Sequence, residues 1–100
     1  MAVVVEVIIP GISRDQYDAL RDAVDWFGTV PDGGLSHIVW WDGDDCHGVD
    51  TWESESAFAA FGETRLGPAM AQLGIEAQVI PTFHDPHEIF VPEAVKITLA

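Results

Sequence analysis

Apolar and polar residues recur with two different periods along this chain, and these periods predict short strands separated by amphipathic helices. Residues 3–9 are almost continuously apolar and rich in Val and Ile, which is typical of a central strand that is buried on both faces. Residues 35–41 and 46–52 are two further β-rich runs, and 75–83 and 95–99 predict a fourth strand and a short fifth.

The first helical segment follows the first strand. We expect Ser13 to begin it, because Gln16 stands three residues later and completes a capping box. Its apolar positions follow the helical period, and Gly28 is the predicted stop.

The second helical segment follows the third strand. Ser54 is its predicted cap, and Gly74 is its predicted end. Gly67-Pro68 predicts a kink or a division near Leu66, because proline donates no backbone hydrogen bond and disfavours helical geometry in the residue before it.

The resulting order, β-α-β-β-α-β, predicts an α+β fold of the ferredoxin-like type with an antiparallel sheet. Right-handed crossovers place the first and third strands together at the centre. One hundred residues are enough for one domain with a single core, so we expect residues 1–100 to form one domain. The two helices of this fold cover only one face of the sheet.

A hairpin between the second and third strands contains the strongest candidate site. With Gly43-Asp44 as a two-residue loop, cross-strand pairing places His37 directly opposite Asp50 on the same face of the sheet. A carboxylate in that position orients an imidazole and fixes its tautomer, as a general acid or base requires. We expect Glu6, on the neighbouring strand, to lie close by and assist. The alternative is a polar cross-strand pair that only completes a hydrogen-bond network.

The face that carries His37 is otherwise apolar. If the helices cover the opposite face, this one exposes Leu35, Val39, Trp41 and Trp52, which is too much apolar surface for water. The simplest cover is a second copy of the chain, so the sequence predicts a homodimer.

Aromatic residues supply candidate walls for a hydrophobic ligand. Trp41 and Trp52 share the His37 face and suit a planar substrate, although packing in the core or at a dimer interface explains them equally. Val39 on the same face and Phe83 at the end of the fourth strand complete the candidate substrate-binding residues.

A second polar cluster, His-Asp-Pro-His-Glu, follows the fourth strand at residues 84–88. His84 is a candidate to assist catalysis, and His84 with His87 is a weaker candidate for binding a metal, or haem through His84. Pro86 makes the segment a loop, so the two imidazoles need not point the same way, and a polar turn is the alternative. We expect no metal and no organic cofactor.

The net charge and the cysteine content limit which partners and which cellular compartment are expected. Four Lys and Arg against 17 Asp and Glu give a formal charge of −13. Such a surface repels phosphate backbones and anionic lipid, so we expect neither nucleic acid nor membrane as a partner. The single cysteine, Cys46, cannot form an internal disulfide, and no stretch is long enough to span a membrane. A cytoplasmic location follows as the expectation.

Several segments in order resemble the dimeric α+β barrel superfamily, and within it small proteins related to antibiotic-biosynthesis monooxygenases. They are the Val-rich first strand leading into residues 10–17 (PGISRDQY), residues 34–37 (GLSH), residues 49–54 (VDTWES), Ala57-Phe58 with Phe61, and the exit from the fourth strand at Phe83-His84. This superfamily includes cofactor-free oxygenases of polyketide phenols, haem-binding relatives, isomerases and cyclases. Its members usually dimerise sheet to sheet. Residues 88–100 extend past the usual end and form a C-terminal extension.

The resemblance implies a cofactor-independent enzyme that acts on a hydrophobic aromatic or polyketide-like molecule as an oxygenase, cyclase or isomerase. His37 and Asp50 would carry the proton transfer. A non-catalytic binding or structural dimer is the alternative, and a metal- or haem-binding protein is a further one.

Overall fold

The computed structural model of the chain describes residues 1–92, and it confirms the βαββαβ order. One irregular turn, η1, joins two short helices in the second helical segment. The elements are β1 (Val3–Pro10), α1 (Arg14–Val24), β2 (Gly34–Asp42), β3 (Asp45–Trp52), α2 (Glu55–Phe61), η1 (Gly62–Leu66), α3 (Gly67–Leu73) and β4 (Ile80–His84).

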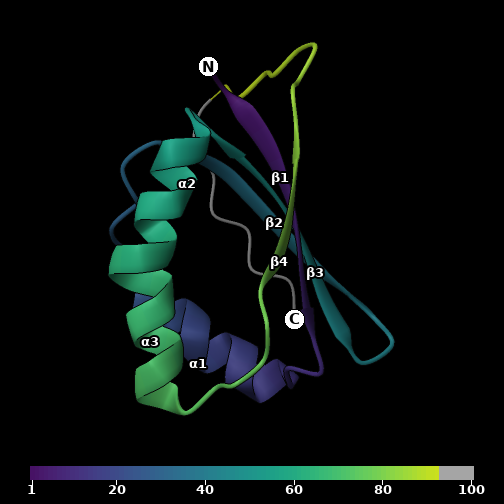
Figure 1. Cartoon of the computed structure of the whole chain (residues 1–100), viewed down its shortest axis with the longest axis vertical. Coiled ribbons are helices and arrows are strands. Elements are labelled where there is room, and N and C mark those ends of the chain that lie inside the picture. Colours follow the sequence, from purple (N-terminus) through teal and green to yellow (C-terminus); the bar gives the residue numbers. More distant parts are fainter. Residues whose placement is uncertain (93–100) are drawn as a thin grey trace.

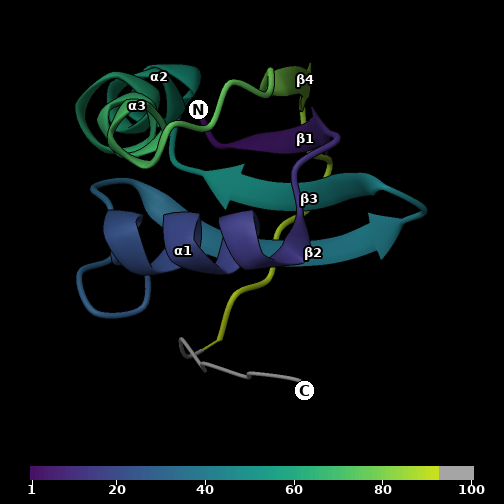
Figure 2. The ribbon, with the colours of Figure 1, turned by 90° about the horizontal axis from the view of Figure 1, so that it is seen from below.

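The four strands form one antiparallel sheet in the order β2-β3-β1-β4 (Figure 2). β1 and β3 are therefore the central pair, as predicted. All helices lie on one side of the sheet, and the described part of the chain leaves the other side uncovered (Figure 1). We call these the inner and the outer face.

The inner face is the one that carries His37, and the prediction that the helices cover the opposite face is therefore wrong. Asp50 and Trp52, which share this face, are only 5% and 0% exposed. Val39 and Trp41 also pack against the core. Strand alternation determines which side chains share a face, but it does not determine which face the helices cover. The argument for a dimer can therefore rest only on the outer face.

Helix α1 begins as predicted but ends earlier. The Ser13 side chain accepts from the Gln16 backbone, and the Gln16 side chain accepts from the Ser13 backbone, so the capping box is confirmed. The helix ends at Asp25 rather than Gly28, because Asp25 adopts the left-handed conformation with a φ of 53°. The Thr29 backbone and hydroxyl both donate to Asp25, and these bonds stabilise the tight turn after the helix.

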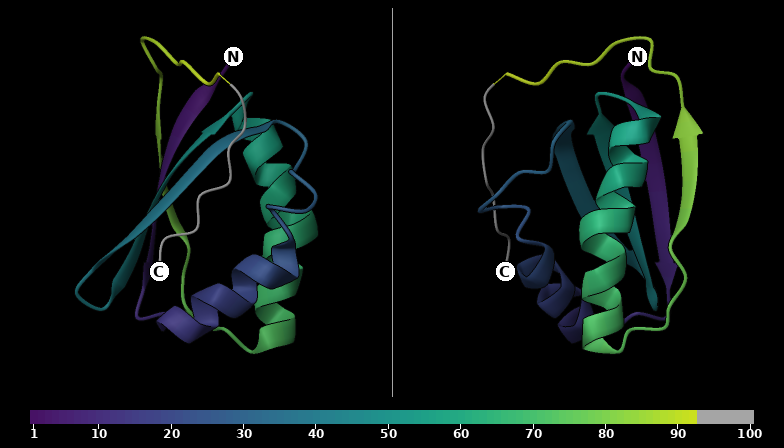
Figure 3. Two further views of the ribbon diagram at one scale, coloured as in Figure 1. Left: turned by 180° about the vertical axis from the view of Figure 1, so that it is seen from behind. Right: turned by 60° about the vertical axis from the view of Figure 1, so that its left-hand side comes forward.

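The second helical segment is continuous rather than broken. η1 is a π-helical turn, in which the Gly67 N–H donates to the Gly62 carbonyl, and it joins α2 and α3 into one rod (Figure 3). This wider turn accommodates Pro68, whose ring would crowd the carbonyl four residues earlier in a regular helix. A Cβ at Gly67 would lie 2.9 Å from the Gly62 carbonyl oxygen, which explains a glycine there.

The fourth strand is shorter than the predicted residues 75–83. β4 spans Ile80–His84, and its register runs from Ile80 opposite Ile8 to His84 opposite Val4. Ile75 belongs to the helix end instead, because its N–H donates to the Met70 carbonyl and its side chain is buried. The predicted strand at residues 95–99 lies outside the described residues.

Candidate active site

The hairpin brings His37 and Asp50 together as predicted. Gly43 has a φ of +60°, Asp42 pairs with Asp45 beside the two-residue loop, and the same register pairs His37 with Asp50. His37 Nδ1 lies 2.6 Å from Asp50 Oδ1. The carboxylate side chain is 7% exposed and the imidazole 25%, so this pair lies at the edge of the core.

Two further side chains extend this pair into a chain of four. Trp52 Nε1 donates to Asp50 Oδ2 over 3.2 Å, and the Tyr17 hydroxyl lies 2.9 Å from His37 Nε2. An ionised Asp50 only accepts hydrogen bonds, so His37 Nδ1 must donate to it. Nε2 of the neutral ring is then an acceptor, and the Tyr17 hydroxyl donates to it. The chain therefore runs from the Tyr17 hydroxyl through the imidazole to the carboxylate.

Burial determines the protonation of two side chains near this pair, Tyr17 on α1 and Cys46 on β3. Desolvation raises the pKa of Tyr17 well above that of a free phenol, and the positive charge of Arg21 partly opposes this shift. Tyr17 is thus a neutral hydrogen-bond donor at ordinary pH. Burial also raises the pKa of Cys46 to about 11, so the protein keeps it as an unreactive thiol.

A pocket of about 70 Å³ lies between the inner face and the helices. Its polar lining residues are Tyr17, Arg21, His37, Cys46 and Asp50, and the rest are Val7, Ile9, Leu20, Val24, Trp26, Phe27, Val39, Gly48, Phe58, Phe61, Leu66 and Val79. Within residues 1–92, no buried side-chain polar atom lacks a hydrogen-bond partner. The arrangement can pass a proton between a molecule in an apolar pocket and an imidazole paired with a carboxylate.

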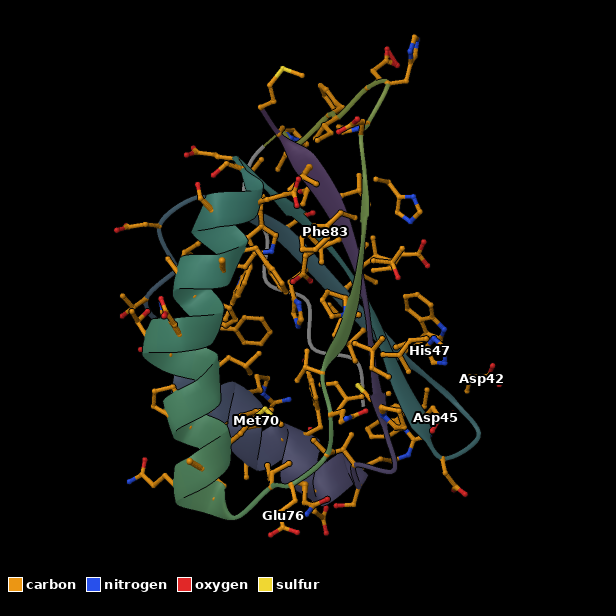
Figure 4. All side chains as sticks on the ribbon, in the orientation of Figure 1. Asp42, Asp45, His47, Met70, Glu76 and Phe83 are labelled. Carbon is orange, nitrogen blue, oxygen red and sulfur yellow. The ribbon has the colours of Figure 1, made fainter. Side chains whose placement is uncertain are left out.

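Only one of the four candidate substrate-binding residues lines this pocket, namely Val39. Trp52 is fully buried, where it packs against Trp26, Phe58 and Phe61. Trp41 shares the inner face but packs edge-on to Tyr17, beneath the guanidinium of Arg14. Phe83 packs against Phe58 on the helix side of the sheet (Figure 4). These three aromatic residues stabilise the walls without reaching the pocket.

Glu6 and His84 do not join the site, which contradicts the expectation that both assist His37. They lie on the outer face, where His84 Nε2 is 2.6 Å from Glu6 Oε1. Side chains alternate along β1, so Glu6 points away from its inner neighbours Val5 and Val7. Glu6 lies on the strand next to the predicted pair, but the alternation of side chains places it on the opposite face of the sheet.

Three residues of the site were not predicted as such. Tyr17, the single tyrosine of the chain, has no role in the sequence-based prediction of the site. Arg21 lies one turn later on the same helix and also lines the pocket. Trp26, in the turn after α1, tilts at 31° over His37 with ring centroids 5.1 Å apart. The spacing of Tyr17 and Arg21 indicated that they share one face of the helix, but only the packing of α1 on β2 shows that this face borders the pocket.

The metal alternative receives no support from the arrangement of the described residues. Among residues 1–92, no three His, Cys, Asp or Glu side chains are grouped closely enough to hold a metal, and His84 and His87 are not brought into such a group. None of the helices in that range has the length and apolar character needed to cross a membrane.

Neither a protein-family model nor a curated protein matches this sequence. Solved structures do match along nearly the whole chain. Rv0793 from Mycobacterium tuberculosis is 20% identical, with a TM-score of 0.67 over 89% of this chain and 98% of its own. SnoaB, a cofactor-independent oxygenase from Streptomyces nogalater, is 11% identical, with a TM-score of 0.62 over 92% and 97%.

A third structure is the ActVA-Orf6 monooxygenase of Streptomyces coelicolor, determined in complex with nanaomycin D. It is 21% identical, with a TM-score of 0.59 over 92% of this chain and 93% of its own. A putative antibiotic biosynthesis monooxygenase from Chloroflexus aurantiacus matches similarly, with a TM-score of 0.60. At these identities the likeness concerns the fold. The chain therefore has the fold of the antibiotic-biosynthesis-monooxygenase-like, dimeric α+β barrel structures.

Proposed function

We propose that this protein is a cofactor-independent enzyme that removes a proton from a hydrophobic aromatic or polyketide-like molecule. The observation that carries this proposal is the chain from Tyr17 through His37 to Asp50 at the edge of an apolar pocket. The fold supports it, because similar structures include cofactor-independent oxygenases. Oxygenation, cyclisation and isomerisation of such molecules all begin with this proton transfer.

The hydrogen bonds define a balanced transfer. The substrate gives its proton to the Tyr17 oxygen while the phenolic proton moves to His37 Nε2. The products are a substrate anion and an imidazolium, which Asp50 stabilises through the existing Nδ1 hydrogen bond. The pocket is smaller than the roughly 300–1,000 Å³ of ordinary ligand sites, so a tricyclic molecule must displace partly exposed lining residues such as Phe27 and Leu66.

Proton exchange tests the proposal without knowledge of the natural reaction. The probe is a hydroxyanthrone, a tricyclic phenol with an acidic ring methylene, and NMR follows exchange of that methylene in deuterated buffer without oxygen. We expect the protein to accelerate exchange and His37→Asn to lower the acceleration about a hundredfold or more. His84→Asn is the matched control, because it removes a histidine paired with a carboxylate on the other face. Full exchange activity in a folded His37→Asn variant would contradict the proposal.

A non-catalytic binding or structural dimer is the second candidate. It is favoured by the small pocket and by a polar network in which every member already has a partner. Such a protein would bind the hydroxyanthrone, or ignore it, without accelerating exchange. The same experiment therefore separates the two candidates.

We also propose a homodimer in which a second copy covers the outer face. The apolar outer side chains are Val4, Ile8, Ile38, Trp40, Val49 and Ile80. Ile38, Trp40 and Ile80 are 62%, 44% and 44% exposed. A stable dimer buries roughly 1,200–2,000 Å² in total. Sedimentation at micromolar concentration should give a dimer, and Ile38→Glu should give a folded monomer because a charge there cannot be buried. A monomeric wild type would overturn this proposal.

A further inference from the structure

Arg21 places a positive charge at the pocket of a strongly acidic protein. The chain has only four Lys and Arg residues, and among residues 1–92 Arg21 is the one that lines the pocket. It lies four residues after Tyr17 on α1, so the two side chains share one helix face. The Arg21 side chain is 28% exposed, which leaves most of it within the protein.

Two carboxylates hold the guanidinium from the solvent side. Nη1 lies 3.3 Å from Asp18 and Nε lies 3.3 Å from Asp22, whose side chains are 58% and 74% exposed. Such exposed pairs neutralise little of the charge. Nη2 has no hydrogen-bond partner among residues 1–92. This nitrogen therefore keeps its capacity to donate to a molecule that enters the pocket.

The other titratable lining groups make this charge important for proton transfer. Tyr17 and Cys46 stay neutral, and His37 gains a positive charge that Asp50 compensates when a proton arrives. The negative charge left on the substrate has no partner among these groups. Arg21 is the remaining cation on the pocket wall, and a guanidinium is suited to an oxygen anion.

We propose that Arg21 binds the anion that proton removal creates, so that the pocket selects molecules that ionise to a phenolate or an enolate. This inference rests on the proposed proton transfer and deepens it by naming the substrate class and its anion-binding residue. A neutral aromatic molecule of the same shape gains nothing from the guanidinium and binds more weakly than the anion.

The first test uses Tyr17 as a built-in phenol. Because the chain has one tyrosine, incorporation of 3,5-difluorotyrosine labels this position alone, and ¹⁹F NMR reports its ionisation in the pocket. We expect Arg21→Gln to raise the pKa of this phenol, because a nearby cation stabilises the phenolate. Arg14→Gln is the matched control, since Arg14 stacks on Trp41 and does not line the pocket. Equal pKa values in wild type and Arg21→Gln would overturn the proposal.

The second test uses 4-nitrophenol, whose phenolate absorbs visible light, as an external probe. We expect the bound probe to have a lower apparent pKa than the free probe in the wild type and in Arg14→Gln. In Arg21→Gln we expect a rise of about one unit, which is a tenfold loss of preference for the anion, and Arg21→Lys should restore part of it. If the bound probe has the same pKa in Arg21→Gln as in the wild type, the role of Arg21 is overturned but the proposed function is not. If 4-nitrophenol does not bind at all, while Arg21→Gln still raises the pKa of the difluorotyrosine, the proposed function is overturned instead.

Discussion

Residues 1–92 contain two histidine–carboxylate pairs with the same separation, and they lie on opposite faces of one sheet. His37 and Asp50 on the inner face and His84 and Glu6 on the outer face both have an N–O distance of 2.6 Å. The inner side chains are 25% and 7% exposed, whereas the outer ones are 49% and 55% exposed. A short distance alone therefore does not distinguish a candidate site from a surface ion pair.

What distinguishes the inner pair is its surroundings. Tyr17 and Trp52 engage the remaining imidazole nitrogen and carboxylate oxygen, and the pair lies against a pocket. The outer face instead carries exposed apolar side chains and scattered polar ones, such as His47 (Figure 4), which stacks on Trp40. A buried network responds to the loss of one member, whereas a solvated pair is replaced by water.

The largest expected difference between the two faces is in stability. We expect Asp50→Asn to lower the free energy of unfolding by about 3 kcal/mol, because a partly buried imidazole and a buried indole N–H lose a charged acceptor. Glu6→Gln, the same change on the outer face, should cost less than about 1 kcal/mol when both variants are made in the monomeric Ile38→Glu background, where the outer pair stays exposed. Urea denaturation of both variants measures this difference. Equal losses would show that the burial of the pair has no energetic consequence.

A smaller effect is expected from the hydroxyl of Tyr17. Tyr17→Phe removes one hydrogen bond to His37 but keeps the ring in the core, so we expect a loss of about 1 kcal/mol. His84→Asn on the outer face should change stability by about 0.5 kcal/mol or less. Thermal and urea unfolding of the two variants would measure the contrast. A Tyr17→Phe variant as stable as the wild type would show that the hydroxyl adds nothing to the network's stability.

A third prediction concerns pH and tests whether water reaches the inner face. Burial raises the pKa of Cys46 from 9.0 to about 11, so the folded state holds this proton more tightly than the unfolded chain does. The resulting stabilisation is complete below about pH 9 and is lost as the pH rises toward about 11. Ionisation of Tyr17, whose pKa is also raised by burial, lowers the free energy of unfolding further at still higher pH.

The free energy of unfolding, measured between pH 8 and pH 11, should therefore decline less steeply with pH in Cys46→Ala than in the wild type. The comparison uses the slope, because the substitution also changes packing by a constant amount. Parallel slopes would show that water reaches the thiol and that the inner face is wetter than its burial suggests.

Local pattern was sufficient to predict the hairpin, because a two-residue loop and strict alternation together determine the register that pairs His37 with Asp50. The capping box at Ser13 and the fold class were likewise predictable. The end of α1 was not, because Asp25 takes a left-handed conformation that the turn to Thr29 stabilises. The π-helical turn at Gly62–Leu66 was not predicted either, since a Gly-Pro step is compatible with a kink, a break or a wider turn.

The sequence by itself determined which side chains share a face of the sheet, through the period of two along each strand. Only the tertiary structure decided which face the helices cover, because both faces are apolar enough to be buried. That one choice gives the His37–Asp50 pair its pocket, Tyr17 and Arg21, and leaves the equally short pair of Glu6 and His84 on the face that the helices do not cover. Periodicity acts between neighbours in the chain, whereas the packing of α1 on β2 joins residues twenty apart.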